Sequence, residues 1–116
     1  MADVVYLVQD LVFGARIEDA AAQLGLAAAK VRDADELPAA ARGARVAIVD
    51  LRLADALRAL DLLAADPETT AVRTVGFIDH ENVDVMRAAS AHGCRTVLSK
   101  RRFANELAAL LSPPPA

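Results

Sequence analysis

The sequence has few of the residue types that extracellular, membrane or nucleic-acid-binding proteins depend on. It contains one cysteine, Cys94, which cannot form an internal disulfide, so we expect a reducing, cytoplasmic setting. Aromatic residues make up 3% of the chain, too few for a platform on which bases stack. No apolar run approaches the length of about 18 residues that a membrane span needs. The first residues, Met1-Ala2-Asp3, lack the basic region of a signal peptide.

Charge and length narrow the class of protein further. The chain has 13 basic and 16 acidic residues, a net charge of −3 and a pI of about 5.3, which argues against direct binding to nucleic acid. A hydrophobic fraction of 55% and a mean hydropathy of +0.29 indicate a packed globular chain. A length of 116 residues suits a single domain with its own core. We expect that domain to span residues 1–112, followed by a Pro-rich tail at residues 113–116.

Strand-like and helix-like segments alternate along the chain. The expected strands span residues 3–9, 28–32, 45–50, 73–78 and 95–99. The expected helices span residues 13–24, 35–41, 53–64, 81–91 and 103–111. Such alternation predicts a parallel sheet with helices on both faces. The near-continuous apolar runs at 45–50 and 73–78 suit central strands. At this length we expect an α/β, flavodoxin-like, doubly wound sheet of five parallel strands in the order 2-1-3-4-5.

Three of the expected strands end in charged side chains. Asp10 follows the first strand, Asp50 ends the third, and Lys100 follows the fifth. In open α/β sheets ligands bind at the carboxyl ends of the strands, and the order 2-1-3-4-5 places Asp10 beside Asp50. Two adjacent carboxylates need a cation, and Mg²⁺ suits carboxylates combined with phosphate oxygens. A carboxylate can also attack phosphorus and form an aspartyl phosphate. The plainer alternatives are that Asp10 caps a helix or turn and that Asp50 is a solvated loop residue.

In their order and spacing, these segments resemble the receiver domain of bacterial two-component response regulators. The resemblance covers residues 3–112. Residues 7–10 match the acidic pair after the first strand, and residues 46–50 match the strand that carries the phospho-acceptor aspartate. Residues 63–67 resemble the end of the third helix, and residues 93–100 match the glycine, strand and lysine segment before the last helix. The resemblance implies that Asp50 is the phospho-acceptor and that Lys100 contacts the phosphoryl group or pairs with a carboxylate. It also implies Mg²⁺ held by Asp10 and Asp50.

The sequence departs from the pattern of that family around the site. Gln9 stands where the family usually has an acidic residue, and the segment that follows Asp50 is short. Asp79 stands at the switch position, where the family usually has Thr or Ser. An ionised aspartate only accepts hydrogen bonds, so it would repel a phosphoryl group. Two roles are open for Asp79: a cap for the helix that follows it, or an ion pair with Lys100.

Three functions compete on these residues. Gln9, Asp79 and the short segment favour an atypical stand-alone receiver-like module that acts in signal transduction through protein–protein contacts, with phosphoryl acceptance at Asp50 impaired or absent. The alternative is a phosphorylation-competent, Mg²⁺-dependent receiver that accepts a phosphoryl group from a histidine kinase on Asp50. A flavodoxin-like small-ligand-binding protein comes third, because residues 10–14 hold a single glycine and no phosphate loop. We expect no enzymatic activity beyond self-catalysed phosphoryl transfer to Asp50.

The resemblance also implies where partners bind. Receivers often dock or dimerise through the face made by the fourth helix, the fifth strand and the fifth helix. In this chain the face would include Arg87, His92, Arg95 and Arg102. We expect signalling proteins as partners, either a histidine kinase or an output protein, with a homodimer as an open alternative. We expect no direct contact with nucleic acid or membrane.

Overall fold

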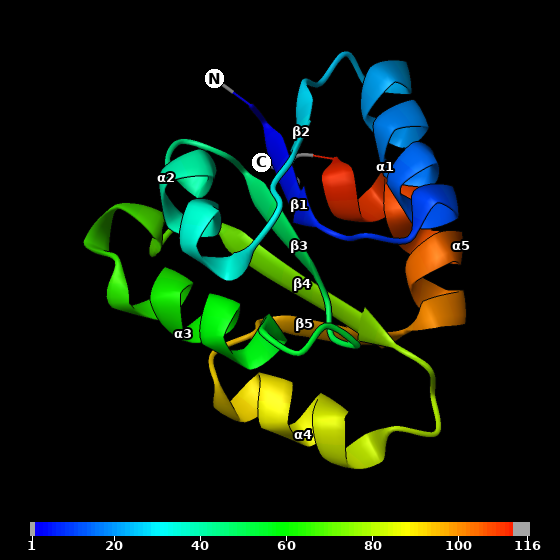
Figure 1. The fold of residues 1–116 in the computed structure, drawn as a ribbon. Coiled ribbons are helices and arrows are strands. Elements are labelled where there is room, and N and C mark those ends of the chain that lie inside the picture. The colour runs from blue at the N-terminus through cyan, green and yellow to red at the C-terminus, as the bar shows by residue number, and fades with distance from the viewer. Residues whose placement is uncertain (1, 113–116) are drawn as a thin grey trace.

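The computed structural model describes residues 2–112, in which a five-stranded sheet lies between two layers of helices (Figure 1). The strands are β1 (Val4–Leu7), β2 (Ala28–Lys30), β3 (Val46–Asp50), β4 (Arg73–Ile78) and β5 (Thr96–Ser99). The α-helices are α1 (Leu11–Gln23), α2 (Leu37–Ala41), α3 (Ala56–Ala65), α4 (Val83–Ala91) and α5 (Lys100–Leu111). Short 3-10 helices precede α2 (Ala34–Glu36) and follow α3 (Pro67–Thr69). The expected tail at residues 113–116 lies outside the described residues.

The sheet is parallel, with the strand order β2-β1-β3-β4-β5, and this confirms the predicted flavodoxin-like topology. Helices α1 and α5 cover one face, and α2, α3 and α4 cover the other (Figure 1). Strand β1 lies between β2 and β3, and Leu7 pairs with Val49. Because both strands run in the same direction, Asp10 and Asp50 lie at the same carboxyl edge.

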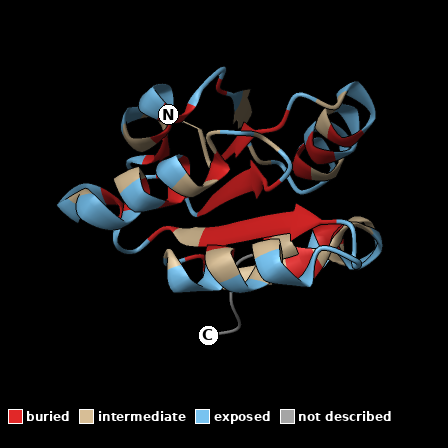
Figure 2. Cartoon of the chain, turned by 60° about the horizontal axis from the view of Figure 1, so that its bottom comes forward, coloured by how far each residue is buried: buried red, intermediate tan, exposed pale blue. Residues whose placement is uncertain are grey.

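Each face of the sheet has its own apolar core. Figure 2 shows central strands that are buried along most of their length and helices that are buried only on the side facing the sheet. On the α1/α5 face the three phenylalanines form one cluster. The rings of Phe77 and Phe103 stack with centroids 4.3 Å apart, and the Phe13 ring lies 5.2 Å from that of Phe77. Phe77 is the strand partner of Asp50, so this cluster lies directly beside the carboxyl edge.

All five helices begin at residues other than those expected, and local capping explains two of the shifts. Helix α1 begins at Leu11 because the Asp10 side chain accepts hydrogen bonds from the backbone N–H groups of the first turn. Helix α5 begins at Lys100 because Ser99 caps it through the Arg102 N–H, at 3.2 Å. Helix α4 begins only at Val83, after a turn at residues 79–82. No helix among residues 2–112 is long and apolar enough to cross a membrane.

Candidate functional site at the carboxyl edge of the sheet

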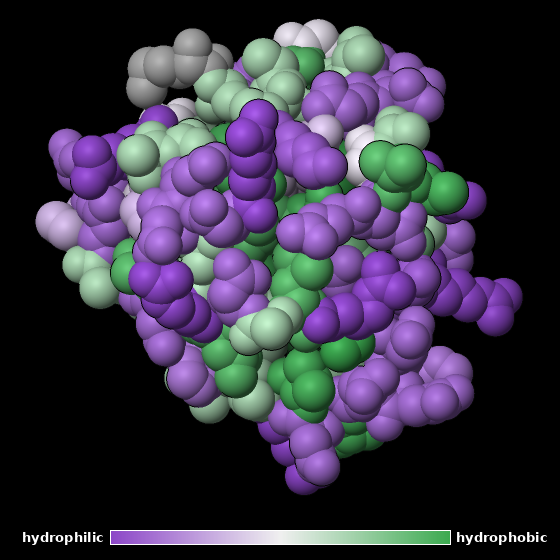
Figure 3. Space-filling view, viewed as in Figure 1, coloured by the Kyte–Doolittle hydropathy of each residue, from purple (hydrophilic) through white to green (hydrophobic). Residues whose placement is uncertain are grey.

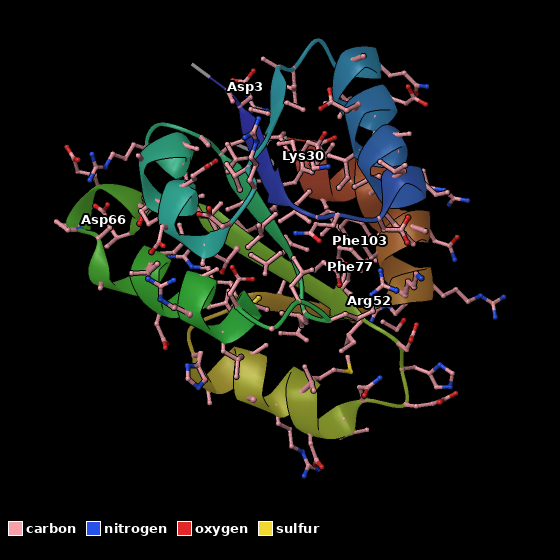
Figure 4. The ribbon with its side chains drawn as sticks, viewed as in Figure 1. Asp3, Lys30, Arg52, Asp66, Phe77 and Phe103 are labelled. Atoms are coloured by element: carbon pink, nitrogen blue, oxygen red, sulfur yellow. The ribbon has the colours of Figure 1, made fainter. Side chains whose placement is uncertain are left out.

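Asp50 is the last residue of β3 and is 1% exposed, although it carries a carboxylate. A buried carboxylate needs hydrogen-bond donors, and Arg52 supplies three of them. The Arg52 backbone N–H and its Nε donate to Asp50 Oδ1 at 3.0 and 3.2 Å. Its Nη2 donates to Asp50 Oδ2 at 3.1 Å. Both carboxylate oxygens are therefore bound by the guanidinium of a residue in the following turn, which Figure 4 shows at this edge of the sheet.

The same guanidinium also reaches the second carboxylate of the site. Arg52 Nη2 lies 3.4 Å from Asp10 Oδ2, a longer contact than those to Asp50. The Arg52 side chain is 38% exposed, whereas that of Asp50 is 2% exposed, so the ion pair is open to solvent on one side only. The hydrogen bond with Asp50 raises the pKa of the Arg52 guanidinium. One side-chain cation thus spans the two carboxylates that the strand order brings together.

Asp10 acts as the N-cap of α1, one of the roles left open by the sequence. Its Oδ1 accepts the backbone N–H groups of Val12 and Phe13 at 2.9 and 3.1 Å. The hydrogen bond from the Phe13 N–H is the main cause that holds the pKa of Asp10 below its ordinary value. The nearby positive charges of Arg52 and Lys100 act in the same direction. The Asp10 carboxylate is therefore ionised at neutral pH. Its Oδ1 caps α1, and its Oδ2 contacts Arg52.

Lys100, the first residue of α5, lies near this site without pairing with Asp50. Its Nζ is 5.0 Å from the centroid of the Phe13 ring, in a cation–π arrangement. Within residues 2–112 it forms no ion pair with Asp50 or Asp79. The ion pair with Lys100, one of the two roles left open for Asp79, is thus absent from the structure. The role of Lys100 as a phosphoryl contact stays a prediction.

Asp79 follows β4 at the same edge and is exposed. Its carboxylate makes no hydrogen bond with any residue that the structure describes, so the expected side-chain cap is also absent. The backbone carbonyl of Asp79 accepts the Asn82 N–H at 3.0 Å, so residues 79–82 form a turn instead of the first turn of the helix. Helix α4 then begins at Val83, beyond the reach of the Asp79 side chain as a cap. The switch role of this position stays a prediction.

The four residues of the expected partner face do not share one environment. Arg87 is exposed on α4, and Arg102 on α5 pairs with Glu106 at 2.8 Å. His92 Nδ1 lies 2.6 Å from Asp61 Oδ1 of α3, and Arg95 Nη2 donates to the Thr70 carbonyl oxygen at 3.0 Å. His92 is therefore engaged by α3, and Arg95 by the segment that precedes β4. Whether the face binds a partner stays a prediction.

This arrangement does not fit a bound Mg²⁺, the cofactor that the resemblance implied. The Arg52 guanidinium lies between the two carboxylates that would coordinate the ion. One Asp10 oxygen is already bound to two backbone N–H groups, and Gln9 provides no third carboxylate. Within residues 2–112 no three His, Cys, Asp or Glu side chains are grouped as a metal site. The cation of this site is therefore part of the protein chain.

Sequence reasoning missed Arg52, the residue that dominates the geometry of the site. One signal was available: the segment after Asp50 is short, and an arginine lies two residues beyond the carboxylate. An aspartate often accepts the N–H of the second residue after it in a turn. That geometry brings the side chain of Arg52 back over Asp50.

Comparison with known proteins agrees with the fold. No protein-family model matches the sequence, and no curated protein matches it at a significant level. The structure is similar to the receiver domain of NtrX from Brucella abortus, with 23% identity and a TM-score of 0.72 over 90% of this chain and 91% of that chain. It is also similar to a putative response regulator from Chloroflexus aurantiacus J-10-fl, with 12% identity and a TM-score of 0.78 over 97% of this chain and 98% of that one.

A response regulator from Hahella chejuensis has the same TM-score of 0.78 at 15% identity, over 96% of this chain and 92% of that chain. Identities this low carry information about the fold only. The chain has the fold of response-regulator receiver domains, and at this level the resemblance drawn from the sequence is confirmed.

Proposed function

We propose that this chain is an atypical receiver-like module of two-component signal transduction. It acts through protein–protein contacts, with phosphoryl acceptance at Asp50 impaired or absent. The observation that carries the proposal is the Arg52 guanidinium bound to both Asp50 and Asp10. Attack on a phosphoryl donor requires a free carboxylate oxygen. Both oxygens of Asp50 accept hydrogen bonds from Arg52, so the nucleophile is engaged before any donor arrives.

The nature of the cation strengthens this proposal. A guanidinium carries only N–H donors and cannot accept an electron pair as a metal ion does. It offsets part of the charge of the two carboxylates, but it cannot act as the Lewis acid that polarises a phosphoryl oxygen. Arg52 thus brings one positive charge where Mg²⁺ would bring two, and it has no coordination position for a phosphoryl oxygen. The Mg²⁺ site expected at Asp10 and Asp50 becomes available only when Arg52 moves away.

The remaining polar groups at this edge support the same conclusion. Asp79 offers a carboxylate instead of a hydroxyl, and an ionised carboxylate repels a phosphoryl dianion. The Lys100 ammonium group lies over the ring of Phe13. In this arrangement neither side chain forms an ion pair or a hydrogen bond with the Asp50 carboxylate.

A role in protein–protein contact draws support from the surface beside the site. Leu11 and Val12, at the start of α1, are 80% and 62% exposed. The side of the molecule seen in Figure 3 is mostly hydrophilic, with apolar residues showing in small groups. Exposed aliphatic side chains next to this site suit docking of a signalling protein such as a histidine kinase or an output protein. The single buried cysteine is in keeping with a cytoplasmic setting.

The test compares phosphoryl acceptance by the wild-type protein and by variants at Arg52 and Asp50. Each protein is incubated with acetyl phosphate, or with beryllofluoride and Mg²⁺, and the adduct is measured by intact mass and by amide chemical shifts. We expect little or no adduct on the wild-type protein. We expect Arg52→Ala to gain an adduct that is lost in the Arg52→Ala/Asp50→Asn double variant.

A matched control separates this effect from a general loss of positive charge. Arg58→Ala removes an exposed arginine that pairs with Asp35 on the surface, so it should behave as the wild type does. A stable wild-type adduct that disappears in Asp50→Asn would overturn impaired acceptance. It would favour the phosphorylation-competent receiver instead.

A further inference from the structure

Three arginines converge on one pocket at the amino edge of the sheet, opposite to the Asp50 site. Arg45 precedes β3, Arg73 begins β4, and Arg95 precedes β5. These strands are neighbours in the sheet, so residues at their amino ends lie side by side. The pocket has a volume of about 330 Å³ and is lined by Arg45, Val46, Ala71, Arg73, Arg95 and Ser112.

No carboxylate of the described residues balances these three charges. Within residues 2–112, none of the three arginines forms an ion pair with an acidic side chain. The nearby Asp3 binds the Arg45 N–H only through its backbone carbonyl. Its side chain accepts the Ala27 N–H instead, at 2.9 Å. The pocket is therefore a local concentration of positive charge in a chain whose net charge is −3.

Backbone contacts hold two of the guanidinium groups in place. Arg73 Nη2 donates to the carbonyl oxygen of Leu110, in the last turn of α5. Arg95 Nη2 donates to the Thr70 carbonyl oxygen at 3.0 Å. In addition, Arg73 Nε is buried and has no hydrogen-bond partner among the described residues. Buried donors are rarely left without an acceptor, so this one calls for an explanation.

These features define the chemistry of a ligand. Each guanidinium offers a planar set of donors that fits a carboxylate or a phosphate, and fixed groups lose less freedom on binding. Val46 and Ala71 add an apolar wall, and the volume lies at the small end of the range for small-molecule sites, which begins at about 300 Å³. We propose that this pocket binds a small organic dianion, either a phosphate ester or a dicarboxylate. This site is separate from the Asp50 site, and the proposal does not depend on the proposed function.

The experiment titrates the protein at low ionic strength with phenyl phosphate, succinate and inorganic phosphate while amide chemical shifts are recorded. We expect at least one organic dianion to shift the amides of residues 45, 71 and 95 at millimolar or lower concentration. We expect inorganic phosphate to bind more weakly, because it cannot use the apolar wall. The tighter of phenyl phosphate and succinate identifies the acid group that the pocket prefers.

Two double variants make the test specific. Arg45→Gln/Arg95→Gln removes two exposed charges of the pocket and should weaken binding by about tenfold or more, which is about 1.4 kcal/mol. Arg32→Gln/Arg87→Gln removes two exposed arginines elsewhere and should leave binding unchanged apart from a small general effect. The proposal is overturned if no probe shifts these amides, if both double variants bind equally, or if the shifts centre on residues 100–102.

Discussion

Arg52 donates three hydrogen bonds to the carboxylate of Asp50, which lies two residues earlier in the chain. One of the three comes from the Arg52 backbone N–H. A hydrogen bond from this N–H to the side chain of the aspartate two residues earlier defines an Asx-turn. The turn fixes the direction of the side chain, so the guanidinium meets the carboxylate without help from distant elements. Asp10, the N-cap of α1, lies within reach of the same guanidinium. The position of the Arg52 guanidinium in this site is therefore determined by local backbone geometry.

Removal of Arg52 should destabilise the fold and create a response to Mg²⁺. In Arg52→Ala the buried Asp50 carboxylate loses its charged partner, and we expect the free energy of unfolding to fall by about 1–3 kcal/mol. The lower part of this range is the better guide, because the Arg52 side chain is 38% exposed and its ion pair is screened by solvent. The two carboxylates then repel each other, so MgCl₂ should restore part of the loss.

Chemical denaturation with and without MgCl₂ measures both effects. The wild-type protein should respond little to the salt, and NaCl at the same ionic strength serves as the control. An equal effect of Mg²⁺ on the two proteins would contradict the view that Arg52 takes the place of a metal ion.

Asp10 should make stability depend on acidic pH. Its folded-state pKa is lowered, chiefly by the hydrogen bond from the Phe13 N–H, and the unfolded value is the ordinary one of about 3.9. A lowered folded-state pKa contributes stability that is fully present above the unfolded pKa and is lost as pH falls through the folded value. Asn also caps helices well, so Asp10→Asn keeps the cap and removes this titration.

Urea unfolding between neutral and acidic pH tests this contribution. We expect stability to fall less steeply below about pH 4 in Asp10→Asn than in the wild-type protein. Asp79→Asn removes an exposed carboxylate without side-chain contacts among the described residues, and its acid profile should match that of the wild type. Identical profiles for all three proteins would show that Asp10 has no such role.

Gly76 and Leu51 should be energetically coupled. A Cβ atom added at Gly76 would lie 3.0 Å from both Cδ atoms of Leu51, too close for an ordinary contact. We expect Gly76→Ala to cost about 1–3 kcal/mol through overpacking. Leu51→Ala alone should cost about 2–5 kcal/mol because it leaves a cavity. The double variant should be more stable than the sum of the two costs predicts, because the new methyl group occupies space left by Leu51.

Equilibrium unfolding of the four proteins in this cycle gives the coupling free energy. Gly14→Ala is the matched control, because its added Cβ would meet only the Tyr6 ring, at 3.7 Å. Strict additivity of the two costs would mean that the close approach at Gly76 is relieved elsewhere in the structure.

Cys94 should be a reporter of unfolding and not a reactive thiol. The residue is 5% exposed, and burial raises the pKa of its thiol, so the reactive thiolate is scarce at neutral pH. We expect reaction with Ellman's reagent to be slow in buffer and fast in urea. Because the chain has a single cysteine, one rate describes the reaction. A native rate close to the denatured rate would mean that the β5 region opens frequently.

The strands and their order could be predicted because they follow from apolar runs and from the rules of parallel sheets. Expected strands at 45–50 and 73–78 appear as Val46–Asp50 and Arg73–Ile78. Helices cover both faces of these two strands, so the strands appear in the sequence as near-continuous apolar runs. Once the order 2-1-3-4-5 is assumed, the shared edge of Asp10 and Asp50 follows.

The contacts within the site could not be predicted, because they depend on turns and side-chain torsions that have no periodic signal. Arg52 reaches Asp50 through the geometry of a single turn. Asp79 does not cap α4, because the helix begins at Val83 and not at Glu81. Lys100 lies over the Phe13 ring, an attraction that the sequence spacing does not reveal.

The order of the strands also bears on how the molecule resists aggregation. The outermost strands are β2 and β5, of three and four residues, and their free edges could pair with the sheet of another molecule. One of the two lysines of the sequence, Lys30, ends β2, where Figure 4 labels it. Short outer strands are poor templates for intermolecular pairing, and a lysine on such a strand weakens the template further. Lys30, in a chain that otherwise relies on arginine, is therefore placed where it opposes the growth of the sheet from one molecule into the next.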